Sequence, residues 1–244
     1  MRTAIISDIH GNLTAFDAVL ADLRETSPDL VLHGGDLADA GSSPEEIVDR
    51  ICALGWLGVA GNTDEMLFRP ESLEEFAKHS SAPAPIWKAV SEIAAATRAR
   101  LGDNRMAWLR KLPHILYAER IALLHASPEN LWLAPAHDAT NTELKSAYGR
   151  LERPVVVYGH IHHPYFRTLQ EGENQHFVII NSGSVGLSYD GDPRASYILV
   201  DDLNVRIRRV EYDMEAEIRL RSSSGLPRAE WISRMLRSAS PQIP

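Results

Sequence analysis

Apolar and polar residues alternate along the first sixty residues in two different periods. Residues 3–7 (TAIIS) and 29–36 (DLVLHGGD) contain short apolar runs typical of buried strands. Residues 13–25 and 43–54 instead place apolar side chains at helical spacing, and residues 56–62 (WLGVAGN) form a third strand-like run. Strands that alternate with helices over short connections predict parallel β-α-β units with helices covering the sheet.

The pattern changes after this region. Residues 64–112 favour helix and show amphipathic stripes. We expect them to form a helical insertion beside the sheet, at the rim of whatever binding site the sheet carries. Strand-like runs return at residues 114–128 and at 154–160 (PVVVYGH). The later runs are closely spaced and joined by turn-like connectors such as EGEN (171–174), so they predict antiparallel pairing. The tail contains a short amphipathic helix in AEWISRMLR.

Length and composition narrow the class of protein. A chain of 244 residues suits one large α/β domain, and we expect residues 1–244 to form one domain with 64–112 inserted in it. The net charge of -8 disfavours non-specific binding of nucleic acid. The single cysteine, Cys52, excludes an intramolecular disulfide and is expected to be a buried small hydrophobe in a reduced cytoplasmic setting. No apolar run approaches the roughly 20 residues that cross a membrane, and no signal peptide is recognised.

Residues that commonly bind metal ions follow several of the predicted strands. They are Asp8, His10, Asp36, Asn62, His125, His160 and His162. The carboxyl ends of parallel strands share one edge of a sheet, so residues distant in sequence converge there. Imidazole with carboxylate suits Mn, Fe, Zn or Ni, whereas an all-oxygen calcium site would not need four histidines. A lone histidine at a strand end is more often an ordinary polar side chain, so the complete set supports the prediction.

These motifs resemble the calcineurin-like metallophosphoesterases. The family pattern runs D-x-H, G-D, G-N-H-D or G-N-H-E, an isolated His and G-H-x-H. This chain has the corresponding motifs in the same order, from residue 3 to about residue 210: Asp8 with His10, Gly35 with Asp36, GNTD at 61–64, His125, and GHIH at 159–162. LLHASPENLW and INSGSVG are similar to the small bacterial phosphoesterases of the family.

The resemblance implies a fold and a metal centre. The fold would be a four-layer α-β-β-α sandwich of two mixed sheets flanked by helices. One divalent ion would be held by Asp8, His10, Asp36 and His162, and a second by Asp36, Asn62, His125 and His160. A hydroxide bridging the two ions would be the nucleophile that hydrolyses phosphodiesters or activated phosphomonoesters. Two divalent ions against two aspartates leave a local charge of about +2, which would attract a small phosphorylated substrate or phosphate ion to an acidic protein.

The chain departs from the family pattern at Thr63, where the family often has a histidine thought to help protonate the leaving group. A threonine hydroxyl is a poor proton donor at neutral pH, so no side-chain acid is assigned and good leaving groups should be favoured. We expect Asp64 to cap the following helix instead of orienting that histidine. Thr63 and His163 are candidate substrate contacts. Backbone N–H groups of NSGSVG (181–186) could bind a phosphate oxygen, or the segment could be a plain turn.

Two other functions are compatible with the ligand set. The first is a metal-binding scaffold or regulatory module with weak catalysis, which the loss of the histidine at position 63 would allow. The second is a nuclease, although the negative net charge and the lack of a basic cluster near the motifs count against it. The remaining histidines have no motif around them and are expected in ordinary surface or core positions: His33, His79, His114, His137 and His176.

Overall fold

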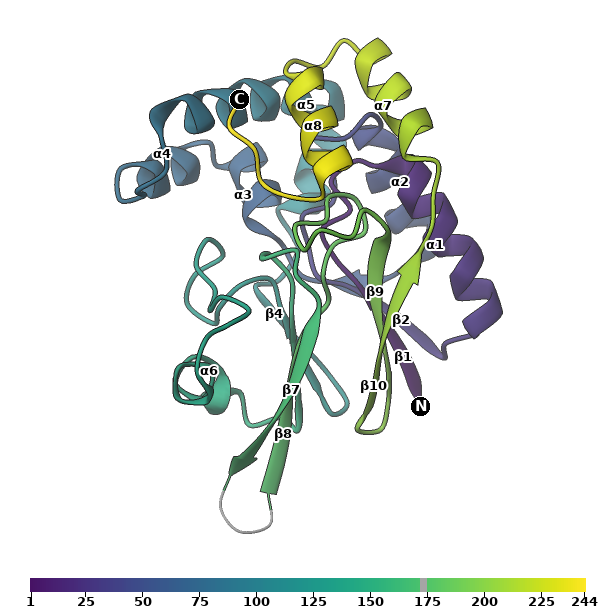
Figure 1. Cartoon of the computed structure of the whole chain (residues 1–244), viewed down its shortest axis with the longest axis vertical. Helices are drawn as coiled ribbons and strands as arrows, with labels where there is room; N and C mark the ends of the chain where they lie inside the picture. The colour runs from purple at the N-terminus through teal and green to yellow at the C-terminus, as the bar shows by residue number, and fades with distance from the viewer. Residues whose placement is uncertain (172–174) are drawn as a thin grey trace.

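Two mixed five-stranded sheets pack face to face with helices on their outer sides, as Figure 1 shows. The computed structural model describes residues 1–171 and 175–244, so most of the turn expected at 171–174 lies outside the described residues. Apolar side chains of both sheets, among them Ile5, Leu32, Val157 and Ile180, form a buried cluster between them. The four-layer sandwich predicted from the resemblance is confirmed.

The first sheet is built from the amino-terminal repeats and the last two strands. Its order is β10-β9-β1-β2-β3, and the strands are β1 (Arg2–Ile6), β2 (Leu30–His33), β3 (Leu57–Gly58), β9 (Ala195–Asp201) and β10 (Asn204–Val210). β1, β2 and β3 are parallel, with β9 antiparallel to β1 and to β10. Helices α1 (Leu13–Thr26) and α2 (Pro44–Leu54) connect the parallel strands. The strand predicted at 56–62 is shorter than expected because a helix already begins at Asn62.

The second sheet has the order β4-β5-β6-β8-β7. Its strands are β4 (Ile115–Ala118), β5 (Ile121–Leu124), β6 (Val155–Tyr158), β7 (Tyr165–Glu171) and β8 (Gln175–Asn181). β5, β6 and β8 are parallel, whereas β7 pairs antiparallel with β8. Antiparallel pairing of the late strands is therefore confirmed for β7–β8 and for β9–β10. Helix α6 (Asn141–Tyr148) and the short 3-10 helix η1 (Gly149–Leu151) cover this sheet with Leu144 and Tyr148.

The helix-favouring region contains α3 (Asn62–Phe68), α4 (Glu71–Ala77) and α5 (Ala84–Leu109). The amphipathic pattern at the end of this region corresponds to α5, which consists of two helical stretches that meet at a kink at Gly102, where φ is 67° and ψ 174°. That this region acts as an inserted cap stays a prediction. No helix in the described part of the chain is long and apolar enough to cross a membrane.

Two helices complete the carboxyl-terminal part, α7 (Met214–Ser223) and α8 (Ala229–Ser238). The amphipathic pattern predicted α8 but not α7. Trp231, Ile232 and Met235 of α8 pack against Ala89 and Ile93 of α5, and Figure 1 shows α7 and α8 beside α5.

The prediction of a buried Cys52 is wrong. Helix α2 buries Ile47, Val48 and Ile51, which face the sheet. Cys52 is rotated about 100° from Ile51 near the carboxyl end of the helix and is exposed to solvent. The apolar stretch around it was continuous in sequence, but a helix turns about 100° per residue, so only part of it reaches the core.

Candidate metal centre

The predicted ligands converge at one end of the sandwich because each follows the carboxyl end of a strand. Asp8 and His10 lie in the loop after β1, and Asp36 lies in the loop after β2. Asn62 is the first residue of α3, after β3. His125 follows β5, and His160 and His162 follow β6 in the second sheet. The centre is thus assembled from both sheets, as the strand-end argument requires.

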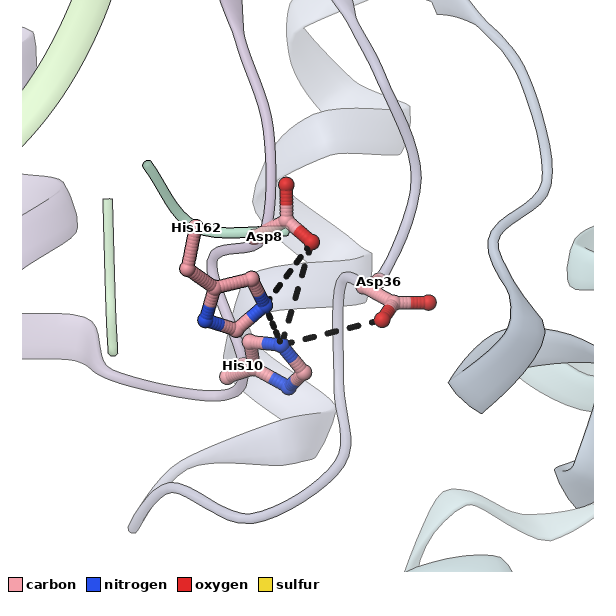
Figure 2. Close-up of side chains that lie close together, drawn as sticks. All are labelled: Asp8, His10, Asp36 and His162. Carbon is pink, nitrogen blue, oxygen red and sulfur yellow. Dashed lines mark hydrogen bonds and ion pairs between the residues drawn. The ribbon is translucent and has the colours of Figure 1, made fainter. Parts of the chain in front are cut away.

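Asp8, His10 and His162, together with Asp36, form what we call the first half-site (Figure 2). One ligand atom from each of these residues lies within 4.8 Å of the others, and all four side chains are buried. His162 Nε2 is 3.1 Å from Asp8 Oδ1 and 3.1 Å from His10 Nε2. His10 Nε2 is also 3.7 Å from Asp36 Oδ2. Two carboxylates and two imidazoles in this space have the composition of a transition-metal site.

Asn62, His125 and His160, again with Asp36, form the second half-site. Asn62 Oδ1 lies 2.8 Å from His125 Nε2 and 2.9 Å from His160 Nδ1. His125 Nε2 is 3.5 Å from Asp36 Oδ2, the same oxygen that faces His10. Asp36 therefore stands between the two half-sites, with one oxygen near a histidine of each.

Three of the four histidines of the centre are oriented by a backbone carbonyl at Nδ1. Nδ1 of His10 is 3.1 Å from the carbonyl oxygen of Asp39, and Nδ1 of His125 is 2.8 Å from that of Gly34. His162 Nδ1 similarly contacts the carbonyl of Leu187. A carbonyl only accepts, so each of these three Nδ1 atoms donates its hydrogen, and Nε2 is the ring atom directed at the centre. The Nε2 atoms of His10 and His162 face each other there, and a divalent cation fits this donor set.

Most ligands sit on an unusual backbone. The φ angles of Asp8, His10, Asp36, His160 and His162 are 55°, 50°, 54°, 68° and 53°, in the left-handed region that non-glycine residues rarely adopt. Such conformations cost of order 1–3 kcal/mol each and persist where the surroundings enforce them, commonly at functional sites. The strand-end loops supply that constraint, since His10 N–H donates to the Asp36 carbonyl at 3.0 Å and Asp8 N–H to Gly35 at 3.0 Å. The motif pattern gave no sign of this geometry.

The electrostatics of the first half-site keep Asp8 ionised and His10 neutral. Burial alone would raise the pKa of Asp8, but His162, His125 and His10 lower it well below its ordinary value. Burial and the neighbouring His162 lower the pKa of His10. The pair therefore offers one anionic and one neutral donor at neutral pH.

In the second half-site the two histidines respond differently. Burial lowers the pKa of His125, but Asp36 and Asp8 outweigh it, so the net shift is upward. This upward shift reports a negative potential at His125 that favours any cation. Burial and the nearby His125 lower the pKa of His160 to about 4. His160 is also the one ligand that is only partly buried.

Asp64 has a larger role than the helix cap that we expected. Its carboxylate accepts the N–H of Gly61 at 3.0 Å, which caps α3, and also the N–H groups of Asp36 and Leu37 at 2.8 and 2.9 Å. Burial and the neighbouring Asp36 raise the pKa of Asp64 to about 7. Asp64 thus ties the loop that presents Asp36 to the start of the helix that presents Asn62.

The first half-site is supported from the carboxyl-terminal helix α7. Arg221 is completely buried, and its Nε donates to the carbonyl of Ala40 at 2.6 Å. Glu217, 1 % exposed, accepts the N–H of Ser42 at 3.0 Å. The loop fixed in this way also contains Asp39, whose carbonyl accepts from His10. Sequence reasoning missed both α7 residues, because no motif marks them.

The two candidate substrate contacts have specific surroundings. Thr63 donates its backbone N–H to Asp36 Oδ1 at 2.8 Å, while its hydroxyl is buried and has no hydrogen-bond partner among the described residues. His163 is partly buried and stacks on His137 with ring centroids 4.0 Å apart. Among the described contacts, only the Thr63 backbone N–H reaches a residue of the centre, Asp36. Tyr189, which the sequence did not single out, stacks on His162 at 4.5 Å.

The segment 181–186 forms a turn whose backbone N–H groups are bonded to other groups of the protein. Gly183 N–H donates to the Asn181 side chain, and the N–H groups of Val185 and Gly186 donate to the carbonyls of Ser7 and Asp8 at 3.0 and 2.9 Å. These donors are therefore engaged within the protein, which favours the plain turn over a phosphate-binding loop. The segment supports the Asp8 loop from the second sheet.

The unassigned histidines are found in both core and surface positions. His33 is fully buried, and burial lowers its pKa to about 4. His79, His114, His137 and His176 are exposed.

Comparisons with known proteins identify relatives of this chain. Residues 1–203 match the calcineurin-like phosphoesterase superfamily domain. An uncharacterized protein of Methanocaldococcus jannaschii is 31% identical over 251 residues, covering 96% of both chains. Phosphodiesterase YfcE of Escherichia coli is 26% identical over 215 residues, covering 83% of this chain and 88% of its own.

Solved structures extend the likeness to the whole chain. A metallophosphoesterase from Sphaerobacter thermophilus is 26% identical with a TM-score of 0.79, covering 98% of this chain and 100% of its own. A hypothetical protein from Pyrococcus horikoshii, 18% identical, superposes with a TM-score of 0.83 over 99% of both chains and supports the fold alone. Helices α7 and α8 lie beyond the matched family domain but inside these structural matches.

Proposed function

This chain belongs to the calcineurin-like phosphoesterase superfamily and is a hydrolase of that family, and we propose that it hydrolyses phosphodiesters or activated phosphomonoesters with two divalent cations. The convergence of the predicted ligands around Asp36 supports this proposal above all. The first half-site would hold one cation and the second half-site the other. When bound, the two cations supply an electrophilic centre for phosphate and a hydroxide nucleophile at neutral pH.

The protein's own residues have distinct tasks in this proposal. Asp36 would bridge the half-sites, and the hydrogen bonds that Asp64 and the Thr63 N–H make to it and to its loop fix its orientation. Asn62 offers a neutral oxygen, so the second half-site keeps more positive charge for the phosphate than an aspartate would leave. No side chain at position 63 donates a proton to the leaving group, so departure depends on the acidity of the leaving group itself.

Removal and restoration of metal tests the proposal. Hydrolysis of bis(4-nitrophenyl) phosphate should fall to background after chelation and return when Mn²⁺ is added to the purified protein. Asp36→Asn, prepared with the same Mn²⁺, is the protein control and should lose about 10³-fold or more, since a metal's electrophilic contribution is worth several kcal/mol. Full activity in the metal-free protein, or unaltered turnover by Asp36→Asn, would exclude a metal-dependent reaction at this site.

A further inference from the structure

A cavity of about 710 Å³ lies between the helices after Asn62 and the loop after His125. We call it the Glu65 pocket. Its wall includes Glu65, Arg69, Ser72, Glu75, Phe76 and Trp132. This volume is within the range of pockets that bind small organic molecules, roughly 300–1,000 Å³. No residue of either half-site lines the pocket.

The Glu65 pocket adjoins the second half-site. Glu65 stands three residues after Asn62 on α3, so the two side chains share a helix face with Cβ atoms about 5–6 Å apart. The N–H of Ala60, just before this helix, donates to the carbonyl of Pro113 at 2.9 Å, which places His114 of the pocket wall beside Asn62's strand end. Trp132 follows His125 in the same loop. An ester group of a phosphodiester whose phosphate is held at the centre could therefore lie in the pocket.

The wall of the pocket is held together by its own contacts. Trp132 Nε1 donates to Glu65 Oε2 at 2.8 Å, and its ring stacks on Phe76 with centroids 5.0 Å apart. Arg69 bonds Glu65 at 2.9 Å and Glu75 at 3.0 Å. The pocket is thus pre-formed, with an aromatic surface on one side and carboxylates beside it. Pre-formed apolar surface with a few polar groups is typical of small-molecule sites.

The charges of the wall restrict the guest. Three carboxylates, from Glu65, Glu75 and Glu129, stand at the wall. Arg69 pairs with Glu65 and Glu75, and Glu129 pairs with Arg150, which lies outside the wall, so one negative charge is left over. The hydroxyl of Ser72 is buried and has no hydrogen-bond partner within the described part of the chain. A group with a second negative charge would be repelled, whereas a neutral or cationic group could contact both aromatic rings and carboxylates.

We propose that the Glu65 pocket binds one ester group of a phosphodiester substrate and selects an uncharged or cationic organic group over an anionic one. This inference rests on the proposed function, because the phosphate itself must be held at the metal centre. It narrows the substrate class to diesters whose second group bears no further phosphate or carboxylate.

Three 4-nitrophenyl phosphodiesters of similar size test this selection. Their second ester groups are choline, its neutral isostere 3,3-dimethylbutyl, and the anionic 2-sulfoethyl. With Mn²⁺ present, kcat/KM for the choline and dimethylbutyl esters should exceed that for the sulfoethyl ester by roughly tenfold, the effect of one nearby like charge in a partly buried site. Equal kcat/KM for the three esters would overturn the selection while leaving the phosphoesterase function intact.

Charge variants locate the effect. Glu75→Lys should remove most of the preference for the choline ester over the sulfoethyl ester. Glu71→Lys makes the same change in net charge on the same helix at an exposed residue outside the wall, and should retain the preference. Equal loss in both variants would show a long-range field instead of the pocket.

Absence of hydrolysis of all three esters with Mn²⁺ would count against the proposed function itself. The dissociation constants of the same esters, measured by calorimetry, would then decide the pocket separately. Tighter binding of the choline and dimethylbutyl esters than of the sulfoethyl ester, lost in Glu75→Lys but kept in Glu71→Lys, would support the proposed selection by the pocket. Equal affinities for the three esters would overturn it.

Discussion

The first half-site contains a second carboxylate, Asp8, beside the shared Asp36, whereas the second half-site has the neutral amide of Asn62 in the corresponding place. The three residues that belong to the first half-site alone, Asp8, His10 and His162, are buried, whereas His160 of the second half-site is partly exposed. Glu65 of the pocket wall shares a face of α3 with Asn62 of the second half-site. More charge and less solvent favour retention of a cation, while less charge and an adjoining pocket favour contact with substrate. Under the proposed function, we therefore call the first half-site the holding side and the second half-site the substrate side.

The two half-sites are also supported from different parts of the chain. Arg221 and Glu217 of α7 fix the loop after Asp36 whose carbonyl holds His10, in the first half-site. Asp64 fixes the backbone of Gly61 and Asp36, next to the second half-site. These supporting side chains can be substituted without changing any candidate ligand. The difference between the two half-sites can therefore be tested by substitutions outside the centre.

The largest expected effect concerns the substrate side, where Thr63 supplies no acid. General-acid help is typically worth about 10²–10⁴-fold, so kcat/KM for phosphodiesters with a 4-nitrophenol leaving group should exceed that for alkyl leaving groups by at least about 10². Thr63→His should raise the alkyl rate about tenfold or more and change the aryl rate little. Similar wild-type rates on both esters, with chemistry rate-limiting, would contradict the missing acid.

Loss of the α7 support should weaken the holding side. Arg221→Met leaves the buried carbonyls of Ala40, Leu226 and Pro227 without their donor, and bonds to charged groups are worth about 1.5–3 kcal/mol each. We expect the free energy of unfolding in urea to fall by about 3 kcal/mol or more, together with weaker binding of one Mn²⁺ ion in calorimetry. Arg219→Met on the same helix is the control, because the Arg219 side chain is 69% exposed. Equal stability of the two variants would show that the α7 contacts do not support the fold or the site.

The smallest effect is expected from Asp64, which holds the backbone of the shared ligand Asp36 and of Gly61 beside the second half-site. Asp64→Asn keeps the shape but replaces one accepting oxygen by an amide nitrogen, so at least one N–H of Gly61, Asp36 or Leu37 loses its acceptor. Residues that orient metal ligands typically contribute 10- to 100-fold, and we expect a loss of about that size in kcat/KM. The exposed Asp103→Asn on α5 should be neutral. A larger loss of Mn²⁺ affinity in the first half-site than in the second would reverse the assignment of Asp64.

Much of the centre could be predicted from the sequence because its residues form short motifs of neighbouring positions. Asp8 with His10, and His160 with His162, are close pairs at the ends of apolar runs, and the ligand types themselves indicate the chemistry. The alternation of strands and helices then predicts that the ends of parallel strands converge. The same local patterns predicted α8 and the antiparallel late strands.

Other features could not be predicted, since they depend on contacts between distant segments. The strand predicted at 56–62 was too long, because Asn62 begins a helix whose Asp64 is bonded to Asp36 in the loop after β2. Cys52 was expected inside, but only the orientation of α2 against the sheet decides which of its residues are buried. The role of Asp64 depends on a loop 28 residues away.

The sequence by itself determined the types and order of the candidate ligands and the family to which the chain belongs. The tertiary structure alone decided the left-handed backbone of five ligands, the support from Arg221 and the pocket beside Asn62. The physical reason is that Arg221, His10 and His125 bond to backbone carbonyls, which every residue possesses. Such an acceptor is chosen by position in space and leaves no pattern in the amino-acid sequence.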